Sequence, residues 1–215
     1  MLNAFGRSIP TTLEEMLSEP SALVVWDMQE GIARRSTNIE TLLETIPKLT
    51  EAARRHHHPV IYSQHSSAPL EFEDRAWIRS LWESSGRGDA GAMLPPYPPG
   101  SPGWQFVAAT APHSDDLVIP KARPNFFVGT QFRSVLAARG IDIVLMTGVA
   151  TERGVLATVR DGANQGIMMV VVTDAVGSFS AAAHERGLQD LGKVAHLCSA
   201  AEVLVAWDQA PSRFS

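Results

Sequence analysis

Short apolar runs alternate along the chain with longer stretches in which apolar residues recur at helical spacing. The stretch 141–160 contains both. It begins with a run rich in branched apolar residues, 141–146, which is typical of a strand buried on both faces. After the break at Thr147-Gly148, the apolar positions follow a helical period, at Val155, Leu156 and Val159. The stretch therefore predicts a strand, a tight turn and a helix, with Gly154 in the first helical turn.

The same alternation extends over most of the chain. Further apolar runs predict strands at 22–26, 59–62, 117–119, 167–172 and 193–197. Helical patterns lie between or after them, at 39–55, 77–82, 128–139, 181–191 and 200–207. Strands that alternate with helices, without an internal repeat, predict an α/β fold. We expect a three-layer α/β/α architecture with a doubly wound parallel sheet of about six strands.

Length and composition favour one domain. The chain has 215 residues, of which 45% are hydrophobic, enough for a full core. We expect a single domain over 1–215, in which 1–20 form an N-terminal extension. The segment 84–112 is rich in Gly and Pro and predicts a long surface loop, of the kind that often acts as a lid or binding loop.

Charge and hydropathy exclude several classes of protein. A net charge of −5 argues against a nucleic-acid surface. The chain has no apolar run approaching the roughly 18 residues that a membrane span needs, and its first residues lack a signal-peptide layout. The expectation is a cytoplasmic protein that binds neither nucleic acid nor membrane.

Cysteine and histidine give no metal signature. The single cysteine, Cys198, allows no intramolecular disulfide and no cysteine-built metal site, and it is expected to be a buried structural thiol. The run His56-His57-His58 ends a predicted helix, where consecutive side chains cannot converge on one ion. His184 is expected to be structural. We predict no metal and no cofactor.

Polar residues that follow the predicted strands are the candidates for chemistry. Asp27 follows the first strand, where partial desolvation favours a protonated carboxyl group that can act as an acid. It could equally cap the next helix. Lys121 ends the third strand and could reach the same edge of the sheet, or be a solvated surface charge. Gln64 and His65, at the end of the second strand, could likewise belong to the site or be ordinary polar residues without a functional role.

Ordered motifs at these strand ends resemble the isochorismatase-like hydrolase superfamily. The motifs are Trp26-Asp27-Met28-Gln29, Pro120-Lys121 with Asn125-Phe126-Phe127, Thr147-Gly148-Val149-Ala150-Thr151 through Thr158, and Asp174-Ala175. The resemblance covers residues 22–204. Most members use an Asp, a Lys and a Cys, and motif matching places the first two on Asp27 and Lys121. The third falls on Gly154, which has no side chain to attack a carbonyl group.

Isochorismatases and aminodeoxyisochorismate hydrolases form a branch that also carries glycine there. The resemblance implies acid-catalysed hydrolysis of an enolpyruvyl ether, with Asp27 as the acid and Lys121 holding a substrate carboxylate or the water. It also implies Gln64 and Arg75 as substrate-binding residues, the arginine as a fork for a carboxylate. Val149, Ala150 and Gly154 are expected to line the site. The peptide between Val149 and Ala150 is expected to be cis.

Two features differ from that branch. Ala150 stands where it usually has an aromatic residue, and Thr151-Glu152-Arg153 is more similar to the amidases of the superfamily. Three hypotheses therefore stay open: a vinyl-ether hydrolase of isochorismate or an analogue, in secondary metabolism; a cysteine-independent hydrolase of another small, amide-type substrate; and a non-catalytic binding protein. The non-catalytic protein would bind a small ligand or a protein partner. The expected substrate is a small anion, and the resemblance implies a homodimer or higher homo-oligomer.

Overall fold

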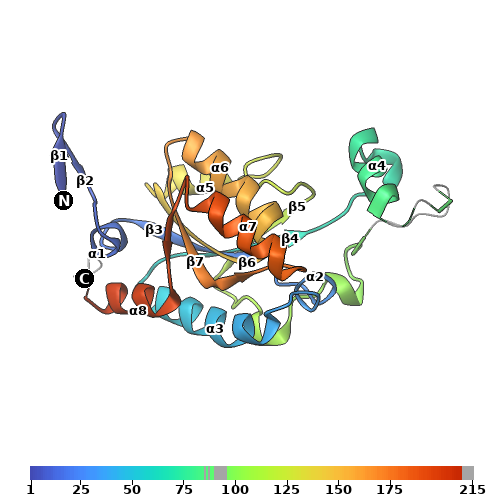
Figure 1. Ribbon diagram of the computed structural model, residues 1–215, viewed down its shortest axis with the longest axis horizontal. Helices are drawn as coiled ribbons and strands as arrows, with labels where there is room; N and C mark the ends of the chain where they lie inside the picture. The colour runs from blue at the N-terminus through green and yellow to red at the C-terminus, as the bar shows by residue number, and fades with distance from the viewer. Residues whose placement is uncertain (85, 87, 90–95, 210–215) are drawn as a thin grey trace.

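The computed structural model describes residues 1–84, 86, 88–89 and 96–209, and its centre is a parallel sheet (Figure 1). Its six strands lie in the order β5-β4-β3-β6-β7-β8, and every neighbouring pair is parallel. The strands are β3 (Ser21–Trp26), β4 (Val60–His65), β5 (Leu117–Lys121), β6 (Ile143–Val149), β7 (Met168–Gly177) and β8 (His196–Cys198). The chain runs outward from β3 to one edge and then from β6 to the other, which makes a doubly wound sheet with a switch point between β3 and β6.

Helices cover both faces of the sheet (Figure 1). One face carries α3 (Ile39–Arg55) and α8 (Ala200–Gln209); the other carries α5 (Phe132–Ala138), α6 (Leu156–Asn164) and α7 (Ala181–Leu191). The short helices α1 (Leu13–Leu17) and α2 (Glu30–Ala33) flank the first strand of the sheet in sequence. The predicted three-layer α/β/α fold is confirmed.

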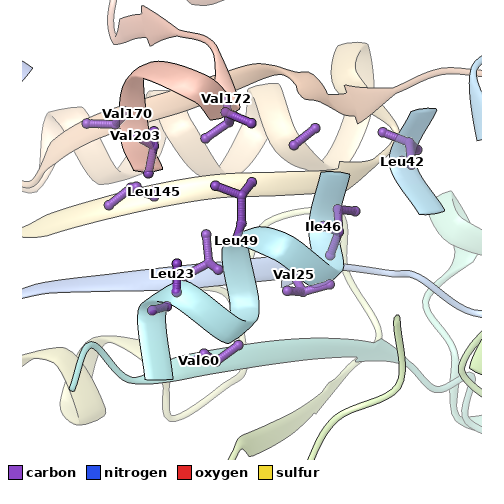
Figure 2. Packing of buried hydrophobic residues seen from close by; sticks show 14 of the residues in the cluster. Leu23, Val25, Leu42, Ile46, Leu49, Val60, Leu145, Val170, Val172 and Val203 are labelled. Carbon is purple, nitrogen blue, oxygen red and sulfur yellow. The ribbon is translucent and has the colours of Figure 1, made fainter. Parts of the chain in front are cut away.

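Alternate residues of each central strand enter the two cores. On β3, Leu23 and Val25 pack toward α3 and α8, whereas Ala22, Val24 and Trp26 face the other helical layer. Figure 2 shows the first core, where strand residues meet Ile46 and Leu49 of α3 and Val203 of α8. Each fully buried Leu or Val contributes roughly 1.5–3 kcal/mol. Burial on both faces explains why these strands read as unbroken apolar runs.

Two helices differ from the sequence prediction. The helix predicted at 128–139 begins at Phe132, because local side-chain hydrogen bonds hold the preceding residues in turns: Asn125 Oδ1 accepts from Phe127 N, and Thr130 Oγ1 from Phe132 N. The helix after β6 begins with a π-helical turn, η5 (Thr151–Val155), before α6 continues it.

The segments outside the sheet include two that were predicted as an extension and a loop. Within 1–20, β1 (Leu2–Ala4) and β2 (Arg7–Ile9) form an antiparallel hairpin apart from the main sheet. Between β4 and β5 lie η1 (Leu70–Phe72), α4 (Arg75–Ser84), η3 (Pro102–Trp104) and η4 (Ala108–Thr110). Figure 1 shows α4 projecting from the sheet edge. Residues 85, 87 and 90–95 of the predicted loop lie outside the described residues.

None of the helices in the described ranges combines the length and the apolar character that crossing a membrane requires.

Candidate active site

A cleft of about 630 Å³ opens at the carboxyl ends of the strands, beside the switch point. Five predicted site residues line it: Asp27, Lys121, Val149, Ala150 and Gly154. They come from the ends of β3, β5 and β6 and from the turn η5. Residues far apart in the sequence thus converge on one cavity because parallel strands present their carboxyl ends at the same edge.

Asp27 and Lys121 form a buried ion pair at this edge. Lys121 Nζ donates to Asp27 Oδ2 at 2.7 Å, and the side chains are only 2% and 8% exposed for Lys121 and Asp27. Ser63 Oγ donates to the other carboxylate oxygen at 2.6 Å and accepts from Asp27 N at 3.1 Å. Both oxygens of Asp27 therefore accept hydrogen bonds. Loss of either partner would leave a buried charge without compensation.

The indole of Trp26 supports the ammonium group. Lys121 Nζ lies 4.2 Å from the centroid of the Trp26 ring, a cation–π distance. The ring also makes an edge-on contact with Phe126, with centroids 5.3 Å apart. Asp27 itself has φ +47°, the left-handed region, which Asp tolerates better than most residues. The chain thus turns sharply after β3 and keeps the carboxylate beside Ser63 and Lys121.

Gly154 lies against the indole of Trp26, so a side chain at this position would have to displace the ring. A Cβ at 154 would be 2.3 Å from Trp26 Nε1 and 2.4 Å from Cε2, far inside van der Waals contact. Trp26 is fully buried and fixed by its neighbours. The place at which most superfamily members are expected to carry a cysteine is therefore filled by an aromatic ring.

The turn between β6 and η5 has the predicted backbone. The peptide bond between Val149 and Ala150 is cis, which confirms the prediction. Gly148, with φ +99°, approaches the backbone of Trp26 so closely that a Cβ would lie 2.0 Å from the Trp26 carbonyl oxygen. Glycine is therefore required at 148.

The structure does not bring the side chain of Gln64 to the cleft lining. It is buried, and its Nε2 donates to the carbonyl oxygen of Trp104 at 3.2 Å. Gln29, a residue of the matched motif without an assigned role, bonds the same carbonyl at 2.8 Å and also holds the backbone of His65. These amides fasten the segment around Trp104 to the ends of β3 and β4.

Lys121 lines the cleft as predicted, but the arginine that the resemblance indicated does not. Arg75 is the first residue of α4, is exposed and is not among the lining residues. Arg35 and Arg153 line the cleft instead, and Arg35 stacks on the ring of Phe179 at 4.7 Å. The place of Arg153 at the site could have been predicted from the sequence, because it precedes Gly154. The place of Arg35 could not, since Arg35 follows a short helix that no pattern predicted.

Three residues that the sequence singled out without a catalytic role, His58, Cys198 and His184, are not among those that line the cleft. His58 bonds Ser21 Oγ through Nδ1 at 3.0 Å and stacks on Trp207, and burial lowers its pKa to about 4. Burial raises the pKa of the Cys198 thiol to about 12, which suits a structural thiol. His184 Nδ1 lies 2.9 Å from Thr151 Oγ1. No group of three potential metal ligands occurs within the described part of the chain.

The fold and the cleft at the switch point of its sheet are those of an α/β enzyme. Residues 21–202 match the isochorismatase domain family, so the chain belongs to the isochorismatase family of hydrolases. The resemblance inferred from the strand-end motifs is confirmed at the level of the family.

Individual relatives carry different names. The chain is 31% identical to the ureidoacrylate amidohydrolase RutB of Pseudomonas syringae pv. syringae, over 79% of this chain and 76% of the relative. It is 27% identical to the isochorismatase family protein YecD of Escherichia coli O157:H7, over 89% and 98%. A cysteine hydrolase structure from Pseudomonas syringae pv. phaseolicola superimposes with a TM-score of 0.77 at 23% identity, over 95% and 97% of the two chains.

Proposed function

We propose that the protein hydrolyses the enolpyruvyl ether of isochorismate or a close analogue and releases pyruvate. This proposal rests on one observation, the difference between the Asp27–Lys121 pair and the position of Gly154 at the cleft. The Asp27–Lys121 pair is present and buried, whereas the Trp26 ring leaves no room for a nucleophile at Gly154. Vinyl-ether hydrolysis needs a proton donor and water but no covalent intermediate. It therefore suits a site of this composition.

In the proposed reaction, Asp27 protonates the terminal vinyl carbon, which makes an oxocarbenium ion at the neighbouring carbon. Water adds to that ion, and the resulting hemiketal collapses to pyruvate and an alcohol. At rest the carboxylate of Asp27 accepts from Lys121 and Ser63. A substrate carboxylate next to Asp27 favours its protonated form, because like charges at close range destabilise one another. Lys121 then stabilises the anionic groups of the substrate.

The cations that line the cleft support an anionic substrate. Arg35 and Arg153 lie at the cleft, and Lys121 lies at its base. Guanidinium groups bind carboxylates with two parallel hydrogen bonds. We therefore assign the binding of a dicarboxylate to Arg35 and Arg153, in preference to Arg75, which does not line the cleft.

A second candidate is the hydrolysis of a small amide by water that the Asp27–Lys121 pair activates. The name of the RutB relative, a ureidoacrylate amidohydrolase, favours it. Without a nucleophile at 154, the amide carbonyl would have to be attacked by water directly, a harder step than attack on an oxocarbenium ion.

Parallel assays with wild-type protein separate the two candidates. Pyruvate from isochorismate is followed by coupling to lactate dehydrogenase, and ammonia from ureidoacrylate is followed in the same preparation. The proposal predicts turnover of isochorismate with little or no ammonia release. Turnover of the amide alone would establish the second candidate, and binding of both compounds without turnover would establish a binding protein.

A further inference from the structure

His65 is a buried histidine at the cleft that the proposed reaction has not yet used. It ends β4 directly opposite Lys121 of β5, so the two side chains emerge on the same face of the sheet. It lines the cleft and is only 8% exposed. Gln29 fixes its backbone on both sides, accepting from His65 N at 2.7 Å and donating to His65 O at 3.1 Å. The imidazole is thus rigidly placed next to the Asp27–Lys121 pair.

The hydrogen bonds of Ser67 determine which ring nitrogen of His65 carries the proton. Ser67 Oγ donates to the carbonyl oxygen of Pro96 at 2.6 Å, and this contact uses its only proton. The 3.2 Å contact between His65 Nε2 and Ser67 Oγ must then have the imidazole as donor. A neutral imidazole protonated at Nε2 has its lone pair at Nδ1.

The Nδ1 atom is open to the cleft. Among the described residues, no group makes a hydrogen bond to this atom. It is also absent from the polar atoms that are both buried and unpartnered, so it is accessible to solvent. A neutral ring with a free, basic nitrogen beside the acid of the reaction is suited to accept a proton from water. We propose that His65 is the base that takes a proton, at Nδ1, from the water that adds to the substrate. This role rests on the function proposed above.

The assignment gives a closed proton cycle. The Asp27 proton forms the new C–H bond that makes the methyl group. The water oxygen bonds to the oxocarbenium carbon while its proton goes to His65 Nδ1. As the hemiketal collapses, the imidazolium gives that proton to the departing ether oxygen, and the hemiketal hydroxyl returns its proton to Asp27. One water is consumed, pyruvate and an alcohol leave, and both side chains regain the states that start the cycle in the substrate complex, Asp27 protonated and His65 neutral.

The surroundings of His65 keep it neutral, as this cycle requires. Burial, followed by the charge of Lys121, lowers the pKa of His65 to about 4, and the charge of Arg123 also lowers it. Asp27 and Glu73 raise this pKa, but by less. Such an imidazole is a weak base. It is sufficient here, because water that bonds to an oxocarbenium carbon becomes strongly acidic and gives up its proton even to a base of this strength.

His65→Gln tests the proposal. The glutamine amide can still donate to Ser67, but it offers no basic nitrogen to the cleft. We expect kcat for pyruvate release to fall by about 100-fold or more, with KM changed by less than about twofold because the residue acts on the water. His58→Gln is the matched control, since His58 is partly buried, bonds the hydroxyl of Ser21 and lies at the other end of β3. It should retain the wild-type kcat.

A nitrogen NMR spectrum of labelled protein tests the tautomer without any substrate. The His65 signals, assigned by their loss in His65→Gln, should show protonation at Nε2 alone at pH 7. A Nδ1-protonated or charged ring would overturn the proposal, as would a kcat of the variant within about threefold of wild type. If wild type itself releases no pyruvate, the proposed function and the role of His65 both fail, whereas the tautomer would be unaffected.

Discussion

On the side of the cleft built by β3, β4 and β5, polar side chains hold one another: Lys121 and Ser63 bond Asp27, and Gln29 fixes His65. On the side built by β6 and η5, the wall consists of Val149, Ala150 and Gly154 with the exposed Arg153 beside them, and the Trp26 ring fills the space next to Gly154. The first side can move protons, and the second offers no atom that could attack a substrate. This difference supports the proposed reaction, in which the site transfers a proton to a substrate that water then attacks.

The largest effect is expected from removing the ammonium group on the polar side. Lys121→Met leaves the buried carboxylate of Asp27 without its cation, which should lower the free energy of unfolding by about 3–5 kcal/mol and abolish turnover. Urea unfolding and the pyruvate assay measure the two effects. Lys193→Met is the matched control, because it removes an exposed lysine paired with Asp190 and should cost only about 0–1 kcal/mol. Equal losses in the two variants would contradict the description of a buried pair.

A thiol on the apolar side should not restore a nucleophile. Gly154→Cys forces a Cβ into the Trp26 ring, and overpacking of this kind costs about 1–3 kcal/mol. We expect a lower melting temperature and slow reaction with a thiol reagent. The double variant Trp26→Val, Gly154→Cys should recover part of the stability and expose a reactive thiol. Gly88→Cys, where a Cβ meets nothing within 4 Å, controls for the thiol itself. Full stability of the single variant would show that Trp26 moves aside readily.

The smallest effects are expected at the rim. Arg35→Gln and Arg153→Gln should each raise KM for isochorismate by roughly two- to tenfold with little change in kcat, because these arginines are expected to bind substrate and transition state equally. Arg75→Gln, on exposed α4, serves as the comparison and should leave both constants unchanged. Steady-state kinetics decides the point. A KM effect at Arg75 with none at Arg35 and Arg153 would reverse our assignment of the dicarboxylate site.

The fold was largely predictable because its central strands are buried on both faces. A strand such as β3 reads as an unbroken apolar run, and the residue that follows it is at the ligand edge of the sheet, which is how Asp27 and Lys121 were found. The start of α5 was missed because side-chain bonds from Asn125 and Thr130 replace the first helical turn. The spacing of apolar residues along the chain does not reveal such hydrogen bonds.

The remaining features of the site depend on contacts between distant segments. Trp26 reads as a strand residue, and nothing local shows that its ring reaches Gly154 in the turn after another strand. Spacing suggested Arg75, but α4 projects from the sheet edge and leaves that arginine exposed (Figure 1). The protonation of His65 follows from the bond between Ser67 and Pro96, which only the folded chain brings together.

Pyruvate release by Asp27→Asn protein tests the central claim most directly. Asparagine keeps the shape of the side chain and can accept from Ser63 or Lys121, but it cannot deliver a proton. The account predicts wild-type turnover of isochorismate and a loss of about 1,000-fold or more in the folded variant, with circular dichroism confirming the fold. A variant that releases pyruvate at the wild-type rate would contradict it.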